Sequence, residues 1–398
     1  MRERGHGFRG WRPSGPWNGA PSSFALALLA ALLIPAFAHA VKPGDLDRSF
    51  GDHGKVRACG GHGGHFVPIA IDAHNRIVSG GDCLSRTLQS GRPDRAFGYT
   101  GGGGHALAFD GGKIVTAGRN GHHGSFDIAR YKANGSPDRS FHGAGFGYPN
   151  QSALSVAVDS HHRPVAAGYS QFATDTDVML ARFKRNGDLD PSFGDGGKVR
   201  TDFGTDSDYA ASVGIDSGGR IVVGVGGDRF ELARYQPDGT LDPSFGNDGK
   251  VTTDFGDRSR LNSIAIDAHN RIVAAGAAPR HEFALARYKP NGRLDRSFSH
   301  NGKVTGPLRG NFSGAGFVGI DSRRRIVAVA AGGVHNYKLA RYKPNGGLDR
   351  SFGRNGVARI GGRTNVWSAA IDSRDRIVIG ACNASAKLVR VIGYRKRS

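Results

Sequence analysis

The side chains best placed to bind a ligand are histidines and arginines in a short turn that recurs along the chain. Each such turn, here called the motif turn, lies between two apolar runs and begins with an aspartate, as in IAIDAHNRIV (Ile69–Val78). The cations that vary between motif turns are His74, His161, His162, His269, Arg323, Arg324 and Arg374. Converging positive charge attracts anions. These seven residues are therefore predicted to form a cationic ring that binds a polyanion.

Other polar residues recur at fixed places and are predicted to serve the fold. One column of aspartates opens the motif turns: Asp72, Asp110, Asp159, Asp216, Asp267, Asp321 and Asp372. A second lies in the element D-x-[SA]-F: Asp47, Asp94, Asp138, Asp190, Asp242, Asp295 and Asp349. A column of arginines comprises Arg130, Arg182, Arg234, Arg287 and Arg341. We expect the first column to accept backbone N–H groups and the second to pair with the arginines.

Neither the acidic nor the histidine-rich loops predict a metal site. Asp175 and Asp177 lie in one loop and Asp206 and Asp208 in another, and each pair supplies too few of the about six to eight oxygens that calcium needs. No cysteine or acidic residue completes a spaced zinc signature around the glycine-rich histidine pairs, which are His62 with His65 and His122 with His123. No metal and no cofactor is predicted.

The three cysteines are Cys59, Cys83 and Cys382. They belong to the first and last repeats, and all fall in connections that we expect on one side of the molecule. An oxidising compartment favours a disulfide there. We predict a bond between Cys59 and Cys83, with Cys59–Cys382 as the alternative.

The elements that position these residues follow from seven copies of the motif. The copies are Ile69–Val78, Leu107–Val115, Val156–Val165, Val213–Val222, Ile264–Val273, Val318–Val327 and Ala369–Val378. In the complete unit 262–304, strands are expected at Ser263–Asp267, Arg271–Gly276 and Phe283–Tyr288, with a fourth within Leu294–Val304. Four strands per unit at this period predict an all-β fold, a seven-bladed β-propeller with four antiparallel strands per blade.

The two ends of the chain are predicted to share the seventh blade. The phenylalanines of D-x-[SA]-F mark the register: Phe50, Phe97, Phe141, Phe193, Phe245, Phe298 and Phe352. The first mark precedes the first motif, and the last unit ends after a degenerate third strand (Leu388–Tyr394). We therefore expect the spare N-terminal segment Leu46–Val56 to supply the missing outer strand and remove an open sheet edge. Unit one has a weak third strand at Leu84–Leu88.

The segments Leu180–Gly204 and Leu232–Gly256 (LARYQPDGTLDPSFGNDGKVTTDFG) are similar to the delta-60 repeat of uncharacterised bacterial β-propellers. The resemblance extends over essentially all of residues 41–398. It implies a propeller fold and export. It implies no substrate and no catalytic residue.

Residues 1–40 are predicted to be a secretory signal peptide. A leader with Arg2, Arg4, Arg9 and Arg12 precedes the apolar run Phe24–Phe37, and Ala38-His39-Ala40 has the pattern of a cleavage site. No later stretch is apolar enough to cross a bilayer. The propeller domain is therefore expected at 41–398, in a secreted or periplasmic protein. Removing the four arginines and one glutamate of the leader lowers the formal charge from +20 to +17.

Composition and motifs together favour binding over catalysis. A basic surface favours anionic partners, such as an anionic glycan or another envelope polyanion. Nucleic acid is disfavoured, because no aromatic stacking platform alternates with the basic residues. The chain has no G-x-x-x-x-G-K-[ST], no G-x-S-x-G and few acids outside the repeats. We expect a non-catalytic binding or scaffold propeller of the cell envelope. The alternative is a hydrolase or lyase acting on a carbohydrate at the mouth of the central channel.

Overall fold

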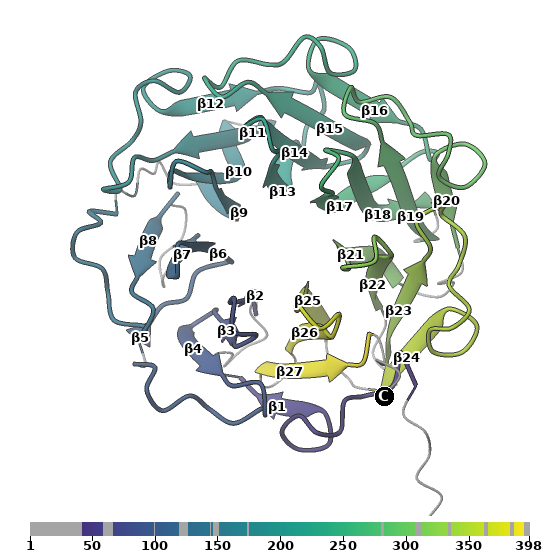
Figure 1. Cartoon of the computed structure of the whole chain (residues 1–398). Coiled ribbons are helices and arrows are strands. Elements are labelled where there is room, and N and C mark those ends of the chain that lie inside the picture. Colours follow the sequence, from purple (N-terminus) through teal and green to yellow (C-terminus); the bar gives the residue numbers. More distant parts are fainter. Residues whose placement is uncertain are drawn as a thin grey trace, which may run out of the picture. The chain divides into compact units, whose positions relative to one another are not determined.

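The computed structural model describes residues 42–58, 67–98, 100–118, 126–143, 145, 151–172, 175–279, 282–306, 312–332, 336–361, 365–382 and 386–393. The regular elements across these residues are β-strands in seven antiparallel sheets, which surround a common centre (Figure 1). The fold is a seven-bladed β-propeller, as the repeats predict. No helix in the described part of the chain is long and apolar enough to span a membrane.

The strands of each blade are given from the centre outward. Blade one contains β2 (Ile69–Ile71), β3 (Ile77–Ser79), β4 (Cys83–Thr87) and β5 (Thr100–Gly101). Blade two contains β6 (Ala106–Asp110), β7 (Lys113–Ala117) and β8 (Ile128–Tyr131), its three strands among the described residues. Blade three contains β9 (Gln151–Val158), β10 (Pro164–Phe172), β11 (Asp175–Arg182) and β12 (Lys198–Thr201).

Blades four to seven continue this order. Blade four contains β13 (Tyr209–Ile215), β14 (Ile221–Gly226), β15 (Phe230–Tyr235) and β16 (Lys250–Thr253). Blade five contains β17 (Arg260–Ile266), β18 (Ile272–Ala278), β19 (Glu282–Tyr288) and β20 (Lys303–Thr305). Blade six contains β21 (Phe312–Ile320), β22 (Ile326–Gly332), β23 (Asn336–Tyr342) and β24 (Val357–Gly361). Blade seven contains β25 (Asn365–Ile371), β26 (Ile377–Cys382), β27 (Ala386–Val391) and β1 (Lys55–Arg57).

The ring closes as predicted, because the N-terminal strand completes the last blade. Strand β1 pairs antiparallel with β27, in a register that joins Val56 to Leu388. An isolated bridge between Leu46 and Val391 extends the contact toward the N-terminus. The outer strand is shorter than the predicted segment Leu46–Val56, because Asp47 organises a turn by accepting hydrogen bonds from the backbone N–H and the hydroxyl of Ser49.

The motif forms the inner hairpin of each blade, and its aspartate holds the turn. Asp267 accepts the backbone N–H groups of His269 and Arg271 at 2.9 Å each, and the Arg271 Nε at 2.7 Å. Between them Asn270 has a φ of 58°, a left-handed conformation that asparagine and glycine tolerate best. The predicted capping role of this aspartate column is confirmed in six blades. In blade two, Asp110 instead contacts side chains of Arg130 and His162.

The hydrophobic core is divided among the interfaces between neighbouring blades. The described residues contain seven buried apolar clusters, and each contains side chains of two adjacent blades. One cluster joins Phe50 and Ala58 near the N-terminus to Val378 and Leu388 of blade seven and Ile77 of blade one. Each blade is therefore stabilised by its neighbours, and the terminal strand contributes to the last interface.

Each blade also contains a buried group that we call the Arg–Asp–Phe cluster. In blade four, Arg234 is 2% exposed, and its Nε donates to Asp242 Oδ2 at 2.8 Å. Its guanidinium carbon lies 4.6 Å from the centre of the Phe245 ring, and its Nη1 donates to the carbonyl of Pro290 in blade five. Burial alone would raise the pKa of Asp242, but hydrogen bonds from Ser244 and the nearby Arg234 lower it overall.

The same arrangement occurs in all seven blades, which confirms the predicted pairing and extends it. The ion pairs are Arg86–Asp94, Arg130–Asp138, Arg182–Asp190, Arg234–Asp242, Arg287–Asp295, Arg341–Asp349 and Arg390–Asp47. The sequence analysis found five of these arginines and missed Arg86 and Arg390. Each of the seven donates to a backbone carbonyl of the next blade, so the clusters connect neighbouring blades around the ring.

Candidate anion-binding site

The structure places all seven predicted ring residues on motif turns. Each of them is exposed: His74, His161, His162, His269, Arg323, Arg324 and Arg374. They belong to blades one, three, five, six and seven, so their side chains extend from separate turns. The cationic ring remains a prediction, because exposure alone does not show that these side chains bind a common ligand.

Two of the seven ring residues, His162 and Arg324, have a backbone conformation that the sequence did not reveal. His162 and Arg324 have φ values of 62° and 61°, so they occupy the left-handed position of the motif turn. The His162 Nδ1 lies 2.6 Å from Asp110 Oδ1 of blade two, and its side chain is 46% exposed. Residues at this position also contact the preceding blade elsewhere, as Asn270 does at Ser217. His162 thus connects two blades and has a carboxylate partner.

Several other predicted residues lie outside the described part of the chain. They are the signal peptide, Cys59, His62, His65, His122 and His123. The expectation that the cysteines lie in connections is wrong for Cys83, which begins β4, and for Cys382, which ends β26. Both are buried, with 2% and 1% exposure. The disulfide between Cys59 and Cys83 therefore stays a prediction.

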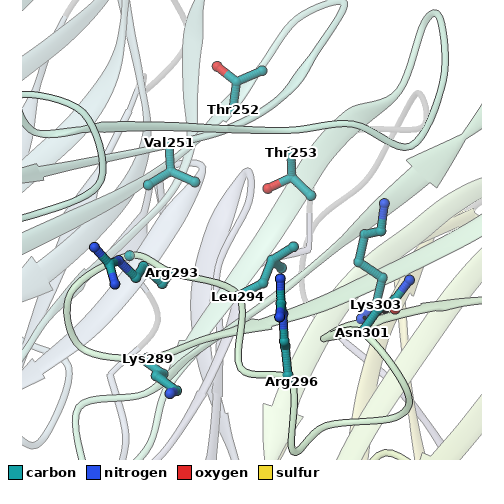
Figure 2. Close-up of a pocket in the computed structure, with 10 residues that line it drawn as sticks. Val251, Thr252, Thr253, Lys289, Arg293, Leu294, Arg296, Asn301 and Lys303 are labelled. Carbon is teal, nitrogen blue, oxygen red and sulfur yellow. Dashed lines mark hydrogen bonds between the residues drawn. The ribbon is translucent and has the colours of Figure 1, made fainter.

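A basic groove lies between blades four and five. The groove has a volume of about 800 Å³, and its lining includes Thr252, Thr253, Lys289, Arg293, Arg296 and Lys303. Figure 2 shows Arg296 and Lys303 extending toward the strand that carries Val251, Thr252 and Thr253. The threonines belong to β16 of blade four. Of the four cations, Lys289, Arg293 and Arg296 come from the connection between β19 and β20 of blade five, and Lys303 is the first residue of β20.

The positive charge of this groove is not neutralised by its walls. None of the described residues that line it is an aspartate or a glutamate. Lys289, Arg293 and Arg296 are exposed, and Lys303 is half-buried, with its Nζ donating to the carbonyl of Asp254 at 2.7 Å. The groove therefore presents four cations, groups that suit sulfate, phosphate or carboxylate oxygens. The hydroxyls of Thr252 and Thr253 are already hydrogen-bonded, to Glu231 and to Tyr288 respectively.

The buried Glu231 of β15 is hydrogen-bonded to one of the residues that line the groove. Its Oε1 accepts a hydrogen bond from Thr252 Oγ1 at 2.9 Å, and the side chain is 3% exposed. Burial raises the pKa of Glu231, the nearby Asp208 raises it further, and the Thr252 hydrogen bond opposes both.

The four cations occur together in one blade. The equivalent residues of neighbouring blades follow from the register of the outer strands. Lys303 pairs with Ala286 in blade five as Lys250 pairs with Ala233 in blade four. Blade four has Gln236, Thr240, Pro243 and Lys250 at these positions, and blade six has Lys343, Gly347, Arg350 and Val357. A feature required by the fold would recur, so this concentration of charge is specific to blade five.

The basic groove was missed from the sequence because its residues are spread from 289 to 303. A column-by-column comparison of the repeats would have shown that one unit has cations at four positions where its neighbours have fewer. The contribution of the strand in blade four required the structure.

Comparison with known proteins supports the fold and an uncharacterised β-propeller family. Residues 112–141, 165–193, 218–245 and 270–298 match the family described as a domain of unknown function (DUF5122) beta-propeller. These segments contain four of the Arg–Asp–Phe clusters, since each ends at the phenylalanine of its cluster. No protein with a curated function matches the chain.

Solved structures resemble the chain at low sequence identity. The WD40 beta propeller domain of Doa1 has a TM-score of 0.56 and 11% identity, covering 88% of this chain and 97% of that domain. A protein of unknown function from Bacteroides caccae has a TM-score of 0.43 and 11% identity, covering 75% of this chain and 99% of the other. The likeness to the first shows the propeller fold alone.

Proposed function

We propose that this β-propeller is a non-catalytic binding module that recognises an anionic polysaccharide through the basic groove of blade five. The observation that carries the proposal is the presence of four cations, at positions not fully cationic in the adjacent blades, around a groove without a lining carboxylate. Its volume of about 800 Å³ is within the range of ligand sites. A few charged units of a longer polymer would fill it.

Export and the motif turns form a second part of the proposal. The predicted signal peptide and the basic composition favour a partner in the cell envelope or outside the cell. The predicted cationic ring of motif turns would offer additional contacts to a long polyanion. The alternative is a hydrolase or lyase acting on a carbohydrate at the mouth of the central channel, which is a different part of the propeller from the basic groove.

The test compares three variants that remove equal charge from different places. Arg293→Glu/Arg296→Glu changes the basic groove, Lys343→Glu/Arg350→Glu changes equivalent positions of blade six, and Arg323→Glu/Arg374→Glu changes the motif turns. The last pair spares Arg324, whose φ of 61° disfavours substitution. Binding of heparin, and of a DNA duplex as a second polyanion, is measured by calorimetry at low and moderate salt.

The groove variant should lose the most affinity for heparin. Each exposed charge pair contributes about 0.2–1 kcal/mol, and reversal converts an attraction into a repulsion, so we expect a loss of about tenfold. The blade-six variant should lose much less, and binding by the parent should weaken with salt. Equal losses in all three variants would instead indicate non-specific attraction by net charge. A loss confined to the motif-turn variant would move the site to the cationic ring.

A further inference from the structure

A cluster of three carboxylates lies at one edge of blade three. Asp175 and Asp177 lie in β11 and not in a loop as the sequence predicted, and Asp202 follows β12 directly. One oxygen of each carboxylate lies within 4.8 Å of the others. The clustering follows from the strands: residues two apart share a face, and the pairing of Val178 with Thr201 brings the next residues of both strands, Asp177 and Asp202, opposite each other.

The buried carboxylate of this cluster has an oxygen without a hydrogen-bond partner. Asp177 is 0% exposed, and its Oδ2 accepts hydrogen bonds from the guanidinium of Arg200. Its Oδ1 is buried and has no partner among the described residues, and the same is true of Asp175 Oδ1. A buried carboxylate oxygen without a partner is costly, and it is satisfied when a cation binds it.

The electrostatics of the cluster also favour a cation. Burial raises the pKa of Asp177, Arg200 lowers it, and the adjacent Asp175 and Asp202 raise it, with a net shift upward. Three carboxylates and one guanidinium leave an excess of negative charge. A divalent ion would offset this repulsion, while Arg200 keeps one oxygen of Asp177 fixed and leaves the other available.

We propose that Asp175, Asp177 and Asp202 form a calcium-binding site. Hard oxygen ligands suit calcium and magnesium and disfavour soft metals. A calcium shell with a radius of about 2.4 Å accommodates oxygens up to about 4.8 Å apart, whereas the magnesium shell of about 2.1 Å is smaller. Three carboxylates supply part of the shell, and water completes it. Such a site resembles weak extracellular modules, with affinity in the range of about 0.1–1 mM.

The other acids of these loops have different roles. Asp208 Oδ2 accepts the backbone N–H of Phe203 at 2.9 Å, and its Oδ1 accepts the hydroxyl of Thr205, so it holds the loop that follows Asp202. Asp206 is exposed and is not part of the cluster. In the sequence, Asp175 and Asp177 alone supply too few oxygens for calcium. The third carboxylate, Asp202, is distant from them in the chain, so the sequence did not reveal it.

Blade four offers a matched control for the experiment. Thr201 pairs with Val178 as Thr253 pairs with Phe230, so Asp254 is the counterpart of Asp202. Both carboxylates accept a hydrogen bond from a glycine N–H two residues later, Gly204 and Gly256 respectively. In blade four the counterpart of Asp177 is Arg229, so no acidic cluster forms there.

The test is titration of the purified, EDTA-treated protein with calcium chloride, followed by calorimetry and thermal unfolding. We expect one calcium ion per chain and a rise in Tm, because the ion binds the folded state. Asp202→Asn and, separately, Asp175→Asn should weaken binding by about tenfold or more, whereas Asp254→Asn should not. Magnesium chloride should bind at least about tenfold more weakly than calcium, given the size of the shell.

Three results would overturn the site. They are the absence of heat and Tm shift at millimolar calcium, equal affinities of the Asp202→Asn and Asp254→Asn variants, and equal affinities of the parent for calcium and magnesium. The site does not depend on the basic groove, so either proposal can fail alone.

Discussion

The Arg–Asp–Phe clusters and the basic groove use arginine in opposite ways. Arg234 in its cluster is 2% exposed, paired with Asp242 and packed on Phe245. Arg293 and Arg296 in the groove are exposed, and no carboxylate lines the cavity around them. The first arrangement occurs in all seven blades, whereas the second occurs in full in blade five.

This difference separates residues that serve the fold from those available to a ligand. A charge that is buried, paired and repeated has its interactions satisfied within the protein, and its removal leaves a partner unpaired. A charge that is exposed, unpaired and present in one repeat costs the fold little and can bind a partner. Substitution of the first set should therefore lower the free energy of unfolding, whereas substitution of the second set should weaken ligand binding and leave stability nearly unchanged.

Loss of a cluster arginine should have the largest effect on stability. Arg234→Met leaves Asp242 buried without its guanidinium and removes the hydrogen bond to the carbonyl of Pro290 in blade five. We expect a loss of about 3–5 kcal/mol in the free energy of unfolding, measured by urea denaturation. The control Arg296→Met should change it by less than about 0.5 kcal/mol. Similar effects of the two substitutions would contradict the division into structural and ligand-binding arginines.

Acid should weaken the fold through the same clusters. The pKa values of their seven aspartates lie below the ordinary value of 3.8, because hydrogen bonds and arginines outweigh the effect of burial in most of them. Their stabilisation is complete above the unfolded pKa and is lost as pH falls below about 4 toward the folded values. Urea denaturation at pH 6 and at pH 3 should show this loss. A free energy of unfolding that stays constant over this range would contradict the role of the ion pairs.

Transfer of the groove cations to blade four should create a second binding site. Gln236→Lys, Thr240→Arg and Pro243→Arg reproduce in blade four the side chains of Lys289, Arg293 and Arg296, beside the existing Lys250. We expect two equivalent sites for a short heparin oligosaccharide instead of one, with little change in stability because surface substitutions usually cost less than about 0.5 kcal/mol. The stoichiometry from calorimetry measures this. An unchanged stoichiometry would mean that the four cations are insufficient to form the site.

The sequence predicted the ring of blades and its closure because each repeat carries its own turn signals. The motif turn and the D-x-[SA]-F element are each short patterns of a few neighbouring residues, so the sequence reveals them. Arg86 and Arg390 were missed because their strands read LSRTL and LVRVI instead of LARY. Their aspartate partners belong to the complete column of the D-x-[SA]-F element. Aligning the repeats on that column would have placed Arg86 at the arginine position, whereas Asp47, the partner of Arg390, lies at the other end of the chain.

The candidate sites were less predictable because they depend on contacts between segments distant in the chain. The basic groove needs the turns of blade five beside β16 of blade four, and the acidic cluster needs β11 beside the end of β12. The sequence predicts a binding site at the motif turns because the cations of each turn are close together in the chain. For His162, the same turn geometry places the side chain against Asp110 of the preceding blade.

A crystal structure of the protein with a short heparin oligosaccharide would test the central claim most directly. We predict sulfate groups in the basic groove, within hydrogen-bond distance of Arg293 and Arg296. An oligosaccharide bound at the motif turns, with the groove empty, would contradict the assignment of blade five as the binding site.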